Sequence, residues 1–312
     1  IRRQRQMCIR DRSQPAAQTV KINFPTAGAS GALYAVGAAI TNMWNNNVPG
    51  VQAASQASAG GIANLNMVSD GEAQVSIAIS SNVYQCLNGT DSFKDHPYKD
   101  LKVIAGLYMN PNQMVVTAKS GIQTLADVKG KRFAVASAGS SVYNESNAHF
   151  TAAGLKFPDD IQAEYITFTD AADMLQNGSI DGAWIMSGAP ASAVTQALTG
   201  GARLVDIDDQ LVKELKAKYP WYASYTIKAG TYPNQDRDVH TTAVKMVMFT
   251  RGDMPEDVVY NLTKAFWEHI DEMGQAQKNL KGLKPEDAVK DIAGVPLHPG
   301  AERYYREIGV LK

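Results

Sequence analysis

Short apolar runs alternate with longer segments of helical period near the start of the chain. Residues 20–24 and 51–57 have the composition of strands, and residues 33–44 and 62–68 repeat apolar side chains with helical spacing. Residues 75–79 form an unbroken apolar run, as expected for a buried parallel strand. This order of strand, helix, strand, helix and strand predicts a parallel sheet covered by helices.

The alternation begins again at Lys131. Before it, two apolar runs predict strands at 101–109 and 113–118 with a turn between them, and 121–130 predicts a short helix that ends in glycine. After it, the pattern predicts strands at 132–136, 163–168, 180–186, 203–207 and 242–249, and helices at 142–153, 170–177, 191–199, 208–218 and 255–273. Thr169 or Asp170 is the expected N-cap of the helix at 170–177.

The repeated pattern predicts an α/β protein with two lobes, and a length of 312 residues suggests about two domains. Residues 219–238 are irregular, and the strand that follows them is expected to cross back to the first lobe. We therefore assign residues 20–118 and 243–312 to lobe 1 and residues 119–242 to lobe 2. Each lobe is expected to be a mainly parallel sheet flanked by helices, with hinge strands between the lobes.

Small and polar residues follow the strands of both predicted lobes. Ligands of open α/β sheets bind beyond the carboxyl ends of the strands, and the free N–H groups of a helix N-terminus hold anions. These turns contain no Arg or Lys, so we expect backbone N–H groups and hydroxyls to bind a small organic anion between the lobes. The candidate residues are Thr26, Ala27, Gly28, Ser30, Ser80, Ser81, Ser137, Gly139, Ser140, Ser141, Ser187, Gly188 and Ala189.

Four side chains outside these turns are further candidates. Gln113 and Asn144 offer amide contacts, with an ordinary surface position as the alternative for each. Tyr34 and Tyr222 would wall the ligand, with packing in the core as the alternative. Glu145 lies on the same predicted helix as Asn144; as a lone carboxylate on a helix it is expected to be solvated rather than catalytic.

Composition and charge narrow the function classes. The chain is 45% hydrophobic and 20% charged, which is ordinary for a soluble globular protein, and its formal net charge of −1 does not point to nucleic acid. The cysteines Cys8 and Cys86 make no disulfide framework, and the histidines lack metal-site spacing. The sequence shows no nucleophile and base that converge on one site. We therefore expect the protein to bind no cofactor and no metal and not to be an enzyme. An enzyme or a ligand-sensing domain on the same two-lobed fold is the alternative.

Residues 1–12 differ from the rest of the chain. They are basic, have no periodicity and lack the apolar region of a signal peptide. Residues 5–12 look like a translated sequencing adapter, so we expect this stretch to be non-native and to stand where a secretion signal belonged. The protein is therefore expected to be exported to the periplasm.

Several segments, in order along the chain, carry a family resemblance: 26–31 with Tyr34, 60–65, 125–132, 232–236 and 296–301. Together they resemble the substrate-binding receptors of the TAXI type, which are the extracytoplasmic components of one branch of the TRAP transporters. The sequence departs from the family pattern at Ser80-Ser81, where a Gln-Ser or Gln-Asn pair is frequent, and at Ala35, where an aromatic residue or Pro is common.

The resemblance implies a type II periplasmic-binding-protein fold and a monomer. It also implies capture of glutamate, another amino acid or a 2-oxo or dicarboxylate, and delivery of that ligand to TRAP transporter membrane subunits driven by an ion gradient. Because both departures lie near the expected cleft, they leave the identity of the ligand open.

Deletion of residues 1–12 is expected to leave the melting temperature unchanged, because these residues contribute no apolar face to either lobe. Differential scanning calorimetry of the truncated and complete chains measures this directly. A large drop in the melting temperature would show that the segment belongs to the fold.

Overall fold

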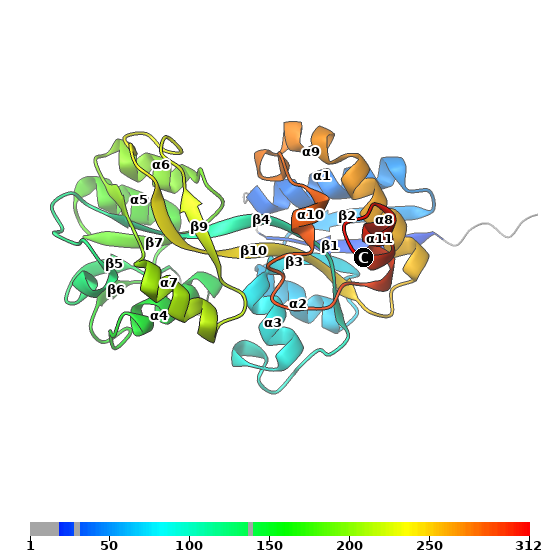
Figure 1. Ribbon diagram of the computed structural model, residues 1–312, viewed down its shortest axis with the longest axis horizontal. Coiled ribbons are helices and arrows are strands. Elements are labelled where there is room, and N and C mark those ends of the chain that lie inside the picture. Colours follow the sequence, from blue (N-terminus) through cyan, green and yellow to red (C-terminus); the bar gives the residue numbers. More distant parts are fainter. Residues whose placement is uncertain (1–18, 28–31, 137–139) are drawn as a thin grey trace, which may run out of the picture.

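The computed structural model describes residues 19–27, 32–136 and 140–312, and its elements fall into two groups (Figure 1). We call these groups lobe 1 and lobe 2. Two long strands, β4 (Leu101–Val116) and β10 (Val239–Arg251), pass between them. The residue boundaries assigned to the two domains from the sequence stay a prediction.

Lobe 1 contains the first elements of the chain and the last. It begins with β1 (Val20–Pro25), α1 (Ala32–Asn47), β2 (Val51–Gln56), α2 (Gly61–Ser69), β3 (Val75–Ile79), α3 (Ser80–Asn88) and η1 (Asp91–Phe93). It ends with α8 (Glu256–Glu268), α9 (Ile270–Ala276), η3 (Lys278–Leu280), α10 (Pro285–Ala288) and α11 (Pro299–Glu307).

Lobe 2 contains the middle of the chain. Its elements are η2 (Leu125–Val128), β5 (Arg132–Ala134), α4 (Ser141–Ala152), β6 (Gln162–Glu164), α5 (Phe168–Asn177), β7 (Gly182–Met186), α6 (Ser192–Thr199), β8 (Arg203–Val205), α7 (Asp209–Lys218) and β9 (Ala223–Ile227). The predicted alternation of strands and helices is confirmed in both lobes.

The sheets are mixed. β1 pairs with β2 in parallel, and β5 is parallel to β6 and β7. β10 is antiparallel to β3, β4 and β9, and β4 is antiparallel to β7 and β8. The sequence predicts a strand at 75–79 that pairs in parallel. The strand is present as β3, but the prediction of parallel pairing is wrong, because β3 pairs with the antiparallel strand β10.

β4 is one strand of 16 residues, where the sequence predicts two strands separated by a turn. Its residues up to Pro111 pair with β10, and its residues from Asn112 pair with β7. Proline has no N–H to donate to a ladder, which suits Pro111 to this change of partner. The chain thus crosses from one lobe to the other in extended form.

Three other elements differ from the sequence expectation. A helix, α3, starts directly after β3, and a strand, β9, lies within the segment expected to be irregular. The helix predicted at 255–273 is interrupted at His269 and forms α8 and α9. The N-cap of α5 is Thr167, whose side chain accepts a hydrogen bond from the Asp170 backbone N–H.

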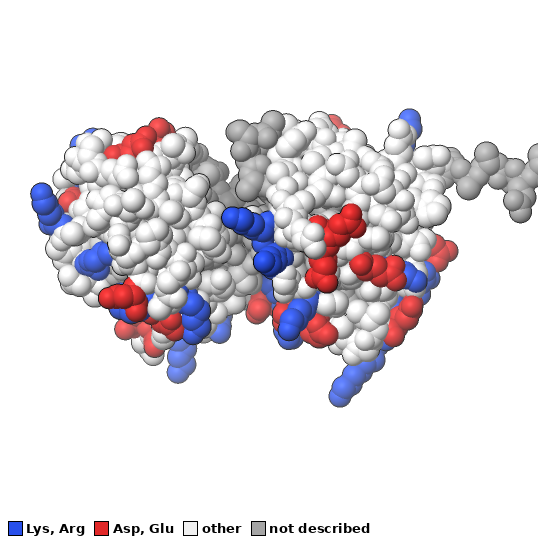
Figure 2. All heavy atoms as spheres, turned by 90° about the horizontal axis from the view of Figure 1, so that it is seen from above, with Lys and Arg blue, Asp and Glu red and all other residues white. Residues whose placement is uncertain are grey.

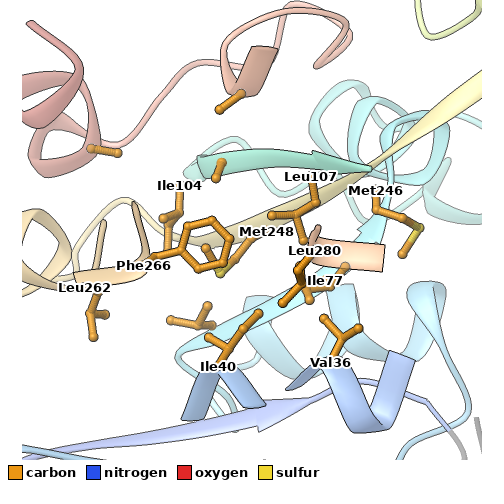
Figure 3. Close-up of a cluster of buried hydrophobic side chains, with 14 of the residues drawn as sticks. Val36, Ile40, Ile77, Ile104, Leu107, Met246, Met248, Leu262, Phe266 and Leu280 are labelled. Atoms are coloured by element: carbon orange, nitrogen blue, oxygen red, sulfur yellow. The ribbon is translucent and has the colours of Figure 1, made fainter. Parts of the chain in front are cut away.

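The largest apolar cluster of lobe 1 forms between the central sheet and the helices on one of its faces (Figure 3). α1 contributes Val36 and Ile40, and α8 contributes Leu262 and Phe266. Side chains of β3, β4 and β10 complete the cluster, so the crossing strands are anchored in this core. Within the residues that the structure describes, no helix combines the length and apolar character needed to cross a bilayer.

Trp44 of α1 tests this core, since it is completely buried and its Nε1–H donates to the Leu262 carbonyl of α8 at 3.0 Å. Replacing Trp44 with Ala is expected to lower the free energy of unfolding by about 3–5 kcal/mol through the cavity left behind. Trp44→Phe keeps a six-membered aromatic ring and removes the indole N–H, so it should lower the free energy of unfolding by less. Urea denaturation measures both, and equal losses would contradict the cavity argument.

Candidate functional site

The N-termini of three helices meet between the two lobes. The Ser141 hydroxyl at the start of α4 donates to Asn82 Oδ1 of α3 at 2.6 Å. A Cβ built on Gly61, the first residue of α2, would lie 3.2 Å from the same Asn82 oxygen. Helices of lobe 1 and lobe 2 therefore present their N-terminal ends to one shared region.

These helix ends differ in how their backbone N–H groups are satisfied. α2 begins after Gly60 and α3 after Ile79, and neither residue gives a side-chain cap. α4 is capped by Ser140, whose hydroxyl accepts from the Tyr143 N–H at 3.1 Å. Among the described residues, the first N–H groups of α2 and α3 thus lack a cap from the side chain of the preceding residue, an arrangement that leaves donors free for an anion.

A cavity of about 210 Å³ lies beside the starts of α3 and α4. We call it the serine cavity, because Ser81 and Ser141 line it together with Asn82 and Glu145. Among the residues predicted from the sequence, it brings together Ser81, Ser141, Asn144 and Tyr222.

The sequence predicts that the Glu145 carboxylate is solvated, and this prediction is wrong. It is 3% exposed, because its position on α4 faces lobe 1. Ser81 Oγ donates to its Oε1 at 3.2 Å, Asn112 Nδ2 donates to its Oε2 at 3.4 Å, and the Tyr222 hydroxyl also bonds to it. Burial raises the pKa of the carboxyl to about 7, although the three donors act in the opposite direction.

A directed chain of hydrogen bonds continues from Asn112 to His149. Asn112 Nδ2 also donates to Thr242 Oγ1 at 3.0 Å, and Thr242 Oγ1 lies 2.7 Å from His149 Nε2. His149 Nδ1 lies 2.7 Å from the Glu145 carbonyl oxygen, which can only accept, so Nδ1 carries the proton and Nε2 accepts from Thr242. Burial lowers the pKa of His149 to about 4, which keeps the ring neutral.

The hydroxyls of Ser80 and Thr26 form hydrogen bonds with backbone groups and do not line the serine cavity. Ser80 Oγ donates to the Trp221 carbonyl at 3.4 Å and accepts from the Lys245 N–H at 3.2 Å. Thr26 is fully buried, and its hydroxyl donates to the Gln56 carbonyl at 3.3 Å. The carbonyl of Ala27 accepts from Ser58, which joins the ends of β1 and β2.

Gly188 and Ala189 line a second and larger space between the lobes, of about 410 Å³. We call it the lysine cavity, because Lys245, Lys278 and Lys281 line it as well. Figure 2 shows Lys and Arg side chains gathered along the boundary between the lobes. Basic residues therefore do reach the boundary, although none occurs in the turns themselves, because they come from β10 and from the segment after α9.

The remaining predicted residues lie apart from both cavities or outside the described residues. Gln113 Nε2 donates to the Ser187 carbonyl at 3.0 Å, so these two residues bind each other. Tyr34 is half-buried in the first turn of α1. Four predicted residues fall outside the described part of the chain: Gly28, Ser30, Ser137 and Gly139.

Comparison with known proteins identifies the family. The NMT1-like family matches residues 24–309. The chain belongs to the NMT1-like family.

Three solved structures show the same fold as this NMT1-like protein. The alkanesulfonate-binding protein SsuA from Xanthomonas axonopodis pv. citri, bound to MOPS, is 18% identical over 93% of this chain and 85% of that chain, with a TM-score of 0.50. The periplasmic aliphatic sulphonate binding protein SsuA from Escherichia coli is 19% identical over 92% of this chain and 78% of that chain, with a TM-score of 0.51. The periplasmic sulfonate-binding protein SsuA from Methylobacillus flagellatus KT is 11% identical over 94% of this chain and 88% of that chain, with a TM-score of 0.52. Its name assigns it to a sulfonate ABC transporter.

These likenesses support the α/β fold with flanking helices that the sequence predicts. The sheets are mixed, where the sequence predicts mainly parallel ones. In the described part of this NMT1-like chain, no group of three or more His, Cys, Asp and Glu side chains has the arrangement of a metal site.

Sequence reasoning missed Asn82 and the burial of Glu145. A signal for Glu145 does exist in the sequence, because Ser141, Asn144, Glu145 and Ala148 are spaced to lie on one face of α4. All four line the serine cavity. Asn82 carries no such signal, since the sequence pattern at the end of β3 does not indicate that a helix begins there.

Replacing Glu145 with Gln is expected to remove a contribution to stability that falls as pH rises. The pKa of Glu145 is raised from 4.5 to about 7 in the folded protein, so the folded state binds this proton more tightly than the unfolded chain. The Glu145 contribution to wild-type stability therefore falls as pH rises from about 4.5 through 7, while the His149 contribution rises. Glu145→Gln, which lacks the falling contribution, should gain up to about 3 kcal/mol relative to wild type above pH 7.

Urea denaturation of both proteins at pH 5 and pH 8 measures this difference, in which the contribution of His149 cancels. Ser81→Ala keeps the carboxyl and should retain the wild-type slope. A Glu145→Gln protein with the same pH dependence as wild type would contradict the assignment.

Proposed function

We propose that this NMT1-like protein is an extracytoplasmic receptor that binds a small organic anion between its two lobes. The observation that carries the proposal is the meeting of helix N-termini from both lobes at Asn82, beside a cavity lined by Ser81 and Ser141. An anion in this position is stabilised by the partial positive charge of the helix ends and by hydroxyl donors, without a basic side chain.

The energy required is within reach of this donor set. A hydrogen bond to a charged group contributes about 1.5–3 kcal/mol. Binding in the micromolar range needs about 8 kcal/mol. The N–H groups at the starts of α2 and α3 supply donors. The Ser81 and Ser141 hydroxyls, which donate to Glu145 and Asn82 without ligand, would add to them by exchanging those bonds for bonds to the anion. Closure of the lobes would exclude water from these donors.

Binding rather than catalysis suits the polar groups at this site. Both ring nitrogens of His149 are engaged, by Thr242 and by the Glu145 carbonyl. Ser141, the serine at the start of α4, donates to an amide oxygen rather than to a base. This arrangement gives no activated nucleophile among the described residues near the cavity.

We further propose that the receptor delivers its ligand to the membrane subunits of a TRAP transporter, which rests on the resemblance to TAXI receptors. Delivery to an ABC transporter is the second candidate, because one protein of the same fold is named with a sulfonate ABC transporter. In either case the ligand is a small molecule and the location is extracytoplasmic.

Asn82→Asp tests the position of the anion. The substitution keeps the size of the side chain and the acceptor for Ser141, and it adds a negative charge where the helix ends meet. We expect affinity for the anion to fall at least tenfold through like-charge repulsion. A thermal-shift screen of amino acids, sulfonates, dicarboxylates and 2-oxo acids selects the ligand, and calorimetry measures its affinity.

The double variant Lys278→Ala, Lys281→Ala is the matched control, because both residues line the lysine cavity. It should bind the same anion as tightly as wild type. Loss of binding in the double variant with full binding by Asn82→Asp would move the ligand to the lysine cavity and overturn the proposed site.

A further inference from the structure

The charges that line the serine cavity are all acidic. The Glu145 and Asp91 side chains line it, and neither Lys nor Arg is among the described residues that do. The Lys218 ammonium lies nearby but sits over the ring of Tyr219, 5.1 Å from its centroid, and does not line the cavity. A bound molecule would therefore meet a negative cavity next to the positive helix ends.

Within the described ranges, Glu145 has hydrogen-bond partners but no counter-ion. Its donors are the hydroxyls of Ser81 and Tyr222 and the amide of Asn112, which are all uncharged. A carboxylate that is buried without an opposite charge is costly even when it is hydrogen-bonded. A cationic group in the cavity would lower that cost.

An aromatic wall faces the same space. Tyr219, Trp221 and Tyr222 line the cavity, and the ring centroids of Tyr219 and Trp221 are 5.0 Å apart. Aromatic faces attract ammonium groups, most strongly the face of Trp. Tyr84 also packs against Trp221, with ring centroids 5.2 Å apart, so the rings that line the cavity belong to a packed group beside the carboxyl groups.

The indole N–H of Trp221 supplies a further observation. Trp221 is 7% exposed, and its buried Nε1 has no acceptor in hydrogen-bond geometry within the part of the chain that the structure describes. The Tyr222 hydroxyl is close both to this N–H and to the Glu145 carboxyl. A ligand oxygen would satisfy this donor, so the cavity offers partners both to a cation and to an anion.

We propose that the serine cavity holds an ammonium group, so that the ligand is a small zwitterion such as an amino acid or an aminosulfonate. This inference rests on the proposed function, in which the helix N-termini hold the anionic group. Glu145 then determines specificity, because it separates ligands that carry an amino group from those that lack one. At about 210 Å³ the cavity is smaller than the roughly 300–1,000 Å³ typical of drug-sized ligands, so the zwitterion is small.

The proposal has a defined dependence on pH. Pairing with an ammonium requires the ionised carboxylate, and burial raises the pKa of Glu145 to about 7 in the unliganded protein. Affinity for a zwitterion should therefore fall as pH decreases below 7, by up to tenfold per pH unit. The other titratable groups around the cavity are Asp91, the neutral His149, and the hydroxyls of Tyr219 and Tyr222.

The experiment compares matched ligand pairs that differ only in the amino group. Glutamate and glutarate, alanine and propionate, and taurine and ethanesulfonate are titrated calorimetrically into the full chain at pH 6 and pH 8. The same titrations are made with Glu145→Gln and with Glu214→Gln, an exposed position that makes the same change of charge.

For the pair that binds, we expect the aminated member to bind about 10- to 100-fold more tightly than its partner in wild type and in Glu214→Gln at pH 8. Glu145→Gln should lose this preference and its pH dependence, and it should bind the member without an amino group at least as tightly as wild type does.

Equal affinity of wild type for both members of a pair would overturn this inference and leave the proposed function standing. A preference for the aminated member that Glu145→Gln retains would show that another group recognises the ammonium, and it would also overturn the inference. Failure of every pair to bind would count against the proposed function itself, and the inference would fall with it.

Discussion

The antiparallel pairing of β4 with β10 is the interaction on which the rest of the structure depends. Both strands belong to lobe 1 along most of their shared ladder, and both continue into lobe 2, where β4 pairs with β7 and β10 pairs with β9. The crossing therefore sets the relative position of two sheets that have separate cores. It also places Asn112 and Thr242 side by side at the point where the lobes meet.

The buried polar chain from Glu145 to His149 depends on this crossing. Asn112 and Thr242 come from the crossing strands, while Glu145 and His149 come from one face of α4. Each group in the chain has a donor or acceptor facing the right partner, which is what makes a buried polar network tolerable. The network also explains how a carboxyl can be buried at the lobe boundary without a cation, because neutral donors carry part of its stabilisation and burial shifts its pKa upward.

The fold alone does not identify the ligand. Proteins that share this fold at 11–19% identity are named as sulfonate-binding proteins, but such distant likeness leaves the site of each protein free to differ. In this chain the features that can select a ligand are local. Helix N-termini of both lobes meet at Asn82. Carboxyl groups and aromatic rings line the smaller cavity, and lysines together with Asp287 and Asp291 line the larger one. The balance of these charges, rather than the architecture, decides what can bind.

The sequence by itself determined the local elements, the two-lobed α/β architecture and the family resemblance. Periodicity reveals a helix or a strand wherever one face is buried, which is why most elements of both lobes were predictable. Only the tertiary structure decided that β4 runs without a turn through Pro111, that β10 pairs beside β3, and that Glu145 is buried. These features depend on which segments meet in the folded chain. A carboxylate on a helix gives the same sequence pattern whether its face of the helix meets water or another lobe.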